Sequence, residues 1–183
     1  MKKAYIFLAD GFEEVEGLTA VDLLRRAGIE VVMVSIKDDV NIKGARGINV
    51  VADTTISESL TDADMVILPG GMPGTNYLKA SDEVKNLVNA YNDAGKYVAA
   101  ICAAPTVFGE MGILQGKKAT CYPGLEHGLL GAMLPGEDYS VVQDGNIITS
   151  RGVGTAIDFA LKLIEVLIDK KKADEIAESI VYK

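Results

Sequence analysis

The strongest constraint on the fold is a series of short, almost purely apolar runs separated by segments with helical periodicity. The apolar runs cover residues 3–9, 30–36, 65–68 and 96–101. Runs of this kind are typical of strands covered on both faces, since a strand with one solvated face would alternate with polar residues. The chain therefore predicts a doubly wound α/β fold, with a mostly parallel sheet and helices on both faces.

Helix signals fall between these runs. The predicted helices cover residues 11–27, 81–94, 105–111 and 156–168. Asp10 is the expected N-cap of the first helix, and Gly28 is expected to end it. A short strand at 118–121, a small hairpin near 48–52, a hairpin at 139–150, and a short final helix and strand complete the expected order. At this length we expect one domain over residues 1–183.

Charge and composition argue against several classes of protein. The 26 acidic and 18 basic residues give a net charge of −8, which disfavours a nucleic-acid partner because phosphate binding needs a basic patch. No apolar run reaches the length of a membrane span, and the first residues lead into a strand rather than a signal peptide, so we expect no membrane partner. Two cysteines without metal-type spacing predict free thiols, a cytoplasmic location and no metal site.

One apolar run leads directly into a cysteine flanked by small residues. Cys102 follows residues 96–101, with Ala100 and Ala104 on either side, and Pro105 marks the start of a helix. Small neighbours are what a nucleophile needs at a sharp strand-to-helix turn. The following helix N-terminus would favour the thiolate. The alternative is an unreactive core cysteine, where unpaired cysteines are usually found.

A glutamate interrupts the buried face of the first predicted helix. Glu16 projects into the stripe formed by Gly17, Ala20 and Leu24, whereas Glu14 falls outside it. A buried carboxylate is costly unless it is paired, and burial raises its pKa. Glu16 therefore indicates a functional site, with a buried structural ion pair as the alternative.

A dense glycine segment follows the strand at residues 65–68. Gly70 and Gly71 would let the backbone approach a ligand closely and aim N–H groups at an anion, or they could form a plain tight turn. Ligands of doubly wound sheets bind beyond the carboxyl ends of the strands. We therefore expect Glu16, the two glycines and Cys102 to converge at one edge of the sheet.

Together these segments resemble the ThiJ/PfpI superfamily, and most closely the branch named for the parkinsonism-associated deglycase (the DJ-one family). The matching segments are residues 9–16 (ADGFEEVE), 25–28 (RRAG), 68–71 (LPGG), 100–106 (AICAAPT) and 149–152 (TSRG). The resemblance implies a flavodoxin-like fold, similar to class I glutamine amidotransferases, and a homodimer. It also implies a catalytic dyad of Cys102 and Glu16.

The resemblance further implies the binding residues of this site. Oxyanion donors would be the backbone N–H groups of Gly70 or Gly71 and of Ala103. Arg26 and Arg46 match arginines that lie close to the site or the dimer contact in relatives. Arg46 on its own could equally be a plain surface residue.

Two positions depart from the patterns of the superfamily. Ala103 stands where the protease-like branch has a histidine, which disfavours a peptidase. Tyr122 stands where many members of the deglycase branch have a histidine, so mechanisms that need that histidine are in doubt. His127, the single histidine of the chain, is a candidate substitute, although a lone histidine in a loop is more often a surface residue.

The resemblance implies a cofactor-free enzyme of the deglycase or glyoxalase type. Its substrates would be small 2-oxoaldehydes such as methylglyoxal and glyoxal, or their adducts on proteins. The alternative is a stress-protective redox sensor or chaperone in which Cys102 is oxidised to the sulfinate, with little turnover.

Overall fold

The computed structural model describes residues 1–136 and 138–182, and its strands and helices alternate as the apolar runs predict. Within this part of the chain, the central sheet has seven strands in the order β5-β2-β1-β6-β7-β9-β8. The strands are β1 (Lys3–Leu8), β2 (Glu30–Ser35), β5 (Thr54–Thr55), β6 (Met65–Leu68), β7 (Tyr97–Ile101), β8 (Val141–Asp144) and β9 (Ile147–Ser150). All neighbours pair in parallel except β8, which runs antiparallel to β9. A separate antiparallel hairpin is formed by β3 (Asn41–Lys43) and β4 (Asn49–Val51).

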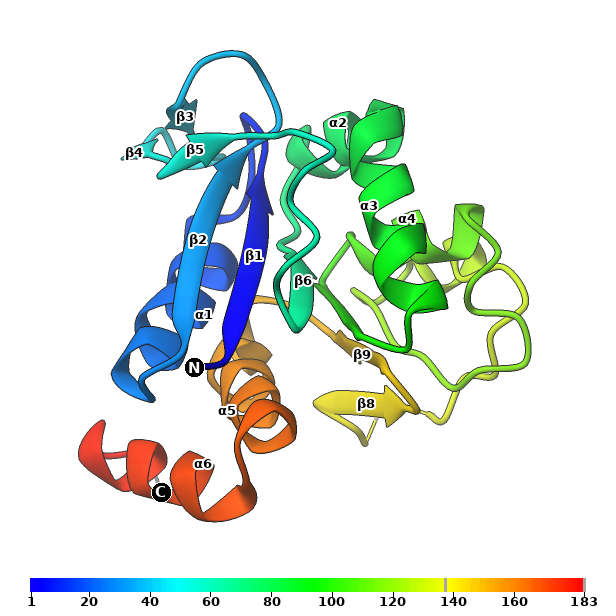
Figure 1. Cartoon of the computed structure of the whole chain (residues 1–183). Helices are drawn as coiled ribbons and strands as arrows, with labels where there is room; N and C mark the ends of the chain where they lie inside the picture. Colours follow the sequence, from blue (N-terminus) through cyan, green and yellow to red (C-terminus); the bar gives the residue numbers. More distant parts are fainter. Residues whose placement is uncertain (137, 183) are drawn as a thin grey trace.

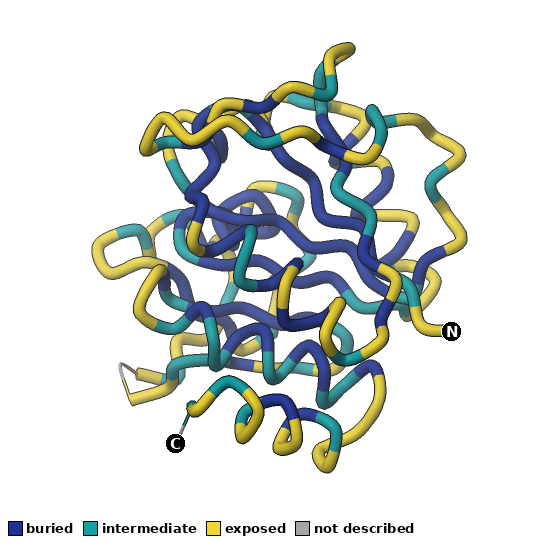
Figure 2. The backbone as a smooth tube through the Cα atoms, turned by 90° about the vertical axis from the view of Figure 1, so that its left-hand side faces the viewer, coloured by how far each residue is buried: buried dark blue, intermediate teal, exposed yellow. Residues whose placement is uncertain are grey.

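Helices cover both faces of the sheet (Figure 1). One face carries α1 (Glu14–Arg26), α5 (Ala156–Leu167) and α6 (Lys170–Ser179), and the other carries α2 (Gly74–Ala80), α3 (Asp82–Asp93) and α4 (Pro105–Glu110). Successive side chains of β1 point to opposite faces of the sheet. Ile6 packs in the core under α1 and α5, and Phe7 packs in the core under α3 and α4. The central strands β1, β6, β7 and β9 are accordingly buried along nearly their whole length (Figure 2). This confirms the doubly wound, flavodoxin-like fold.

The start of the first helix was wrongly predicted. The helix begins at Glu14, and Asp10 does not cap it. Instead Asp10 accepts the backbone N–H of Lys43 at 2.9 Å and pairs with the ammonium of Lys37 at 2.7 Å. Asp10 therefore binds distant residues instead of capping the helix, because a hydrogen bond to a charged ammonium is stronger than one to a neutral amide. The predicted end of this helix is correct, since Gly28 follows it with a φ of 82°.

Four further local features differ from the expectations. The expected strand at 118–121 is reduced to an isolated bridge between Lys118 and Met133. Residues 180–182 form no strand after α6, and the helix α2 was not predicted. Glu14 is buried, because the backbone of residues 44–48 folds over it. Helical periodicity cannot predict the burial of Glu14, since the residues that cover it belong to a distant loop.

The parallel strands place several chain segments at one edge of the sheet. β1, β6, β7 and β9 are consecutive neighbours and end at the same side. They are followed by the loop into α1, by Gly70, by Cys102 and by Arg151. Of the helices that the structure describes, none combines the length and apolar character needed to cross a bilayer.

Candidate active site

Cys102 occupies the corner between β7 and α4, in an uncommon backbone conformation. Its φ is 65°, a left-handed value that costs a non-glycine residue about 1 kcal/mol or more. Two hydrogen bonds hold it there: the Cys102 N–H donates to the carbonyl of Ser150 at 3.0 Å, and its own carbonyl accepts the N–H of Tyr122 at 2.8 Å. The turn leaves Cys102 partly exposed, whereas Cys121 is buried. This geometry is that of a nucleophile at a strand-to-helix elbow.

Glu16 lies beside this thiol, reached from the first turn of α1, and is only 1% exposed. Its Oε2 accepts the backbone N–H of Gly70 at 3.0 Å and the carboxylate is hydrogen-bonded to Cys102. Oε1 is buried and has no hydrogen-bond partner among the described residues. Burial raises the pKa of Glu16 to about 7; the hydrogen bonds from Cys102 and Gly70 lower it, and the charge of Glu13 adds to the rise. Glu16 is therefore poised to gain or lose a proton near neutral pH.

The thiol of Cys102 is not acidic when Glu16 is ionised. Burial raises the pKa of Cys102 to about 12, with the negative charge and hydrogen bond of Glu16 acting in the same direction and the N–H groups of Ala103 and Gly71 opposing them. The N–H of Ala103 at the helix start does favour the thiolate, as expected, but burial and Glu16 outweigh it, and α4 has only six residues to contribute a dipole. The thiol therefore keeps its proton at neutral pH, and Glu16 is the neighbouring group that can exchange one.

Of the two glycines after β6, Gly71 is the one whose N–H faces the sulfur. The N–H of Gly70 is already bonded to Glu16, whereas those of Gly71 and Ala103 stabilise negative charge at Cys102. Gly70 has a different role: a Cβ there would lie 2.6 Å from both the Cys102 Cβ and Glu16 Oε2. Only glycine lets these two side chains meet.

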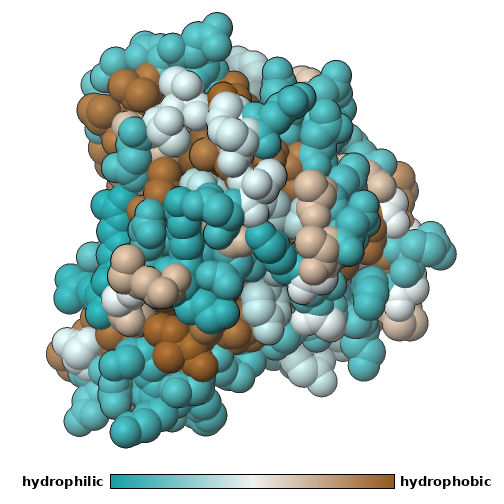
Figure 3. Space-filling view, in the orientation of Figure 1, coloured by the Kyte–Doolittle hydropathy of each residue, from teal (hydrophilic) through white to brown (hydrophobic). Residues whose placement is uncertain are grey.

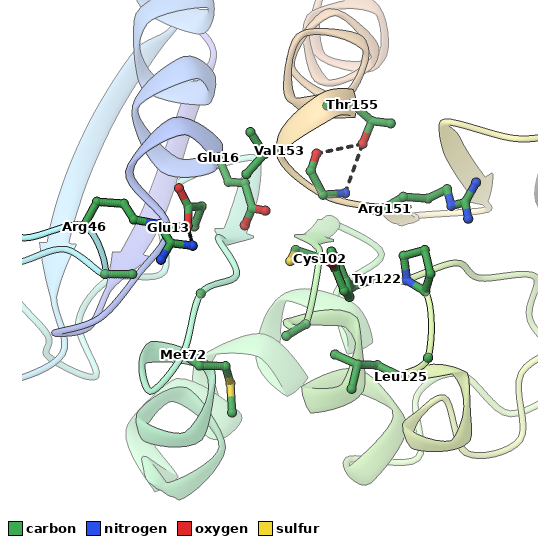
Figure 4. A pocket seen from close by; sticks show the side chains of 17 residues that line it. Glu13, Glu16, Arg46, Met72, Cys102, Tyr122, Leu125, Arg151, Val153 and Thr155 are labelled. Carbon is green, nitrogen blue, oxygen red and sulfur yellow. Dashed lines mark hydrogen bonds and ion pairs between the residues drawn. The ribbon is translucent and has the colours of Figure 1, made fainter.

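The thiol opens into a cleft of about 920 Å³ (Figure 4). The side chains labelled around it belong to Glu13, Glu16, Arg46, Met72, Cys102, Tyr122, Leu125, Arg151, Val153 and Thr155. Tyr122 is 52% exposed and forms one wall next to Cys102. The position that many members of the branch fill with histidine is therefore at the site, occupied here by an aromatic ring.

The predicted accessory residues divide into two groups. Arg46 lines the cleft and pairs with Glu13 at 3.3 Å. Arg26 lies at the other end of α1, pairs with Asp22 and does not line the cleft. His127 sits on a short 3₁₀ helix and lines a neighbouring smaller cavity behind Ala103. The structure thus places Tyr122 next to the thiol and Arg46 at the edge of the same cleft, whereas Arg26 and His127 lie outside this cleft.

The loop after β9 also belongs to the site, although its residue types alone predict no role for it. Gly152 lies next to Cys102 and Tyr122, and its backbone is held by Thr155. The available signal was topological: β9 is parallel to β7, so the residue that follows its carboxyl end must lie near Cys102. Pairing of the strands cannot be deduced from apolar runs alone, and this is why the loop was missed.

Several protein groups of complementary chemistry meet at this point. A thiol and a carboxyl lie side by side, and two backbone N–H groups are available for negative charge at the same point. Within residues 1–136 and 138–182, histidine, cysteine, aspartate and glutamate side chains form no group of three or more that could hold a metal ion. Such a set can form a covalent adduct with an electrophilic carbon and move protons around it.

Comparisons with known proteins agree with this picture. The pattern of the DJ-1/PfpI family matches residues 2–166. The chain is 41% identical to Protein dj-1beta of Drosophila melanogaster over 98% of its length and 97% of the relative's. It is 30% identical to a Caenorhabditis elegans protein named glutathione-independent glyoxalase DJR-1.2, over 98% of this chain and 96% of that one. A structure titled Toxoplasma gondii DJ-1, oxidized, superposes with a TM-score of 0.94 at 39% identity, covering 100% of this chain and 99% of the other.

The raised pKa of Glu16 predicts a pH-dependent loss of stability. Below the ordinary value of 4.5 the carboxyl is protonated in both the folded and the unfolded chain. As pH rises from 4.5 to about 7 only the unfolded chain releases the proton, so the folded state loses stability across that window, by at most about 3 kcal/mol.

Replacing Glu16 by glutamine removes this titration. We expect the melting temperature of Glu16→Gln, relative to wild type, to increase by several degrees between pH 5 and pH 8. Because the amide adds a buried donor, a constant offset between the proteins is also expected, and the change with pH is the readout. Thermal unfolding with Glu58→Gln, an exposed site, as the control measures it; a constant difference across this range would contradict the assignment.

Proposed function

The chain belongs to the DJ-1/PfpI family, and we propose that it is a cysteine-dependent, cofactor-free enzyme that converts small 2-oxoaldehydes, free or as protein adducts, into 2-hydroxy acids. The observation that carries the proposal is Glu16, a buried carboxyl with a pKa of about 7 hydrogen-bonded to the Cys102 thiol. The name of the Caenorhabditis elegans relative, a glutathione-independent glyoxalase, supports the same activity.

The first step is addition of the sulfur to the aldehyde carbon of methylglyoxal. Glu16 accepts the thiol proton as the carbon–sulfur bond forms, and the aldehyde oxygen takes up the negative charge. The N–H groups of Gly71 and Ala103 stabilise that oxygen. Glu16 then returns its proton to the oxygen, which gives a neutral hemithioacetal on Cys102.

The second step moves a proton between the two carbons. The Glu16 carboxylate removes the proton of the former aldehyde carbon, giving an enediolate. The hydroxyl proton passes from the first oxygen to the second as Glu16 delivers its proton to the neighbouring carbon. The product is a thioester of lactate on Cys102. Water then adds to the thioester carbonyl, the sulfur leaves, and lactate is released. The net reaction is methylglyoxal plus water to lactic acid, without a redox partner.

Removing either member of the pair should abolish turnover. We expect Cys102→Ser to lower kcat/KM for methylglyoxal by at least about 10³-fold. Glu16→Gln, which cannot carry the proton, should lower it by roughly 10²-fold or more. Steady-state loss of methylglyoxal and of glyoxal measures both, with Cys121→Ser as the matched control because that thiol is buried away from the cleft. Full turnover by Cys102→Ser would rule out the proposal.

A redox sensor with little turnover is the second candidate function. The supporting observations are the unpaired Oε1 of Glu16 next to a partly exposed thiol, and the similarity to a structure titled as an oxidised DJ-1. Each of two equivalents of peroxide would transfer one oxygen to the Cys102 thiolate and leave as water, giving sulfenate and then sulfinate. Protonated Glu16 could then donate a hydrogen bond to the sulfinate.

Selective oxidation would distinguish this candidate. Burial raises the pKa of both thiols to about 12, so acidity alone does not separate them. Solvent access distinguishes the two thiols, because Cys121 is 2% exposed whereas Cys102 opens into the cleft. After mild peroxide we expect mass spectrometry to find two added oxygens on Cys102 and an unmodified Cys121. Equal oxidation of both cysteines would count against a sensor.

We also propose that the protein forms a homodimer through the β3–β4 hairpin and the start of α1. Ile48 and Val51 of the hairpin and Val15 of α1 are exposed apolar side chains, and Figure 3 shows hydrophobic side chains gathered over β4. Glu14 Oε1 accepts the N–H groups of Arg46 at 2.8 Å and Ile48 at 3.3 Å, which fixes the hairpin against the helix. A fixed apolar surface of this kind favours association.

A charge placed on this surface should separate the subunits. Wild type is expected to elute in size-exclusion chromatography with light scattering at about twice the chain mass of 19.4 kDa. Val51→Asp should elute as the monomer, because a carboxylate would be desolvated in the contact. The control is Val181→Asp, at a residue that is also highly exposed but lies at the other end of the chain. A monomeric wild type would refute the proposal.

A further inference from the structure

The peptide unit that presents the Ala103 N–H to the sulfur is anchored at its other end. Its carbonyl is that of Cys102, which points away from the N–H as in any trans peptide. This carbonyl accepts the backbone N–H of Tyr122 at 2.8 Å. The next carbonyl, that of Ala103 itself, accepts the N–H of Thr106 at 3.1 Å and also the Thr106 hydroxyl at 2.7 Å. Ala103 is therefore held on both sides of its Cα.

The same arrangement recurs at Gly71, the other residue whose N–H faces the sulfur. The unit that carries this N–H has the carbonyl of Gly70, which accepts the backbone N–H of Glu13 at 2.9 Å. The carbonyl of Gly71 accepts the N–H of Thr75 at 2.9 Å and the Thr75 hydroxyl at 2.9 Å. A glycine with a φ of 93° has few steric limits of its own, so these hydrogen bonds set its conformation.

Both threonines are buried next to the residues that they hold. Thr75 is 1% exposed and Thr106 is 5% exposed, and both line the smaller cavity of about 300 Å³ behind Ala103. Each is the second residue of its helix, α2 or α4, and its hydroxyl reaches back to the segment before that helix. Neither side chain lines the cleft that contains the sulfur. An effect of either hydroxyl on the reaction must therefore pass through the backbone.

The hydroxyl bonds add direction rather than basic pairing. Each of the two carbonyls already accepts a backbone N–H, so the hydroxyl is not needed to satisfy a buried acceptor. Two donors from one residue restrict the direction of the carbonyl more than one donor does. The N–H and the carbonyl of a residue are related by only two soft torsions, so holding one constrains the other. Stabilisation of developing negative charge depends on donors that are aimed before the reaction starts.

Building on the proposed function, we propose that Thr75 and Thr106 are positioning residues: their hydroxyls keep the two backbone N–H donors directed at the Cys102 sulfur and at the oxygen that becomes negative beside it. Thr75 acts through Gly71, and Thr106 acts through Ala103. The effect on the oxygen requires the proposed reaction, whereas the effect on the thiolate does not.

Steady-state kinetics with methylglyoxal test the role in turnover. Thr75→Val and Thr106→Val remove the hydroxyls with little change in side-chain shape. We expect each to lower kcat about ten-fold, less than the roughly 10²-fold that follows complete removal of such a donor. KM should stay within about two-fold, because the interaction strengthens in the transition state. Thr75→Ser and Thr106→Ser keep the hydroxyl and should recover most of the wild-type kcat.

The chain offers a matched control for the loss of a hydroxyl bond within a helix. The Ser179 hydroxyl donates to the carbonyl of Ile176 at 2.8 Å, in α6 and away from the cleft. Ser179→Ala should therefore leave kcat unchanged. A wild-type kcat in either valine variant, or a loss that serine does not restore, would overturn the inference. Thr75→Ala and Thr106→Ala remove the same hydroxyls and replace a valine variant that does not fold.

Alkylation of Cys102 tests the same role without requiring turnover. In a Cys121→Ser background, the Cys102 thiolate forms a carbon–sulfur bond with iodoacetamide while iodide leaves. Misdirected N–H donors stabilise the thiolate less, so a smaller fraction of the protein carries it at a given pH. We expect the valine variants of Thr75 and Thr106 to be alkylated about three-fold more slowly across pH 7 to 9, and the serine variants at nearly the wild-type rate, by mass spectrometry.

The two measurements separate the positioning role from the activity. Should wild type consume no oxoaldehyde while the valine variants are alkylated more slowly and the serine variants are not, the proposed function fails and the positioning of the N–H groups stands. Equal alkylation rates in wild type and the valine variants remove the positioning role, whatever the turnover.

Discussion

The site depends on the close approach of three chain segments at Gly70. Its N–H holds the carboxyl of Glu16, and the absence of a side chain lets that carboxyl reach Cys102. The contact links α1, the end of β6 and the end of β7, which only neighbouring parallel strands can bring together. Burial raises the pKa of Glu16 there, the like charge of Glu13 adds to the rise, and the hydrogen bonds to the carboxylate only partly offset it. Its affinity for a proton follows from this environment.

Much of the fold and the centre of the site follow from local sequence patterns. Apolar runs predict the buried strands because a strand covered on both faces leaves no position for polar side chains. The small residues around Cys102 predict its elbow, and the helical phase of Glu16 predicts its burial; the structure agrees on both. These features are set by residues near each other in the chain, so the sequence displays them directly.

The features that could not be predicted depend on distant partners. Asp10 has the sequence of a helix cap, yet Lys37 and Lys43 from another segment bind it. The sequence does not distinguish Gly70 from Gly71. The backbone conformation of the turn directs the N–H of Gly70 to Glu16 and that of Gly71 to the sulfur. Gly152 reaches the thiol only because β9 pairs with β7. Each of these outcomes requires knowledge of which strands and loops are neighbours.

The two outermost strands also determine how this sheet meets other molecules. β5 has only two residues, and β8 has four and ends in Asp144, which is bonded to Lys117 and Lys118. Short or charged edge strands disfavour pairing with a strand of another molecule, and so disfavour a sheet that continues from one molecule to the next. The parallel strands that carry the thiol are therefore insulated from cross-β aggregation, even though they are among the most apolar segments of the chain.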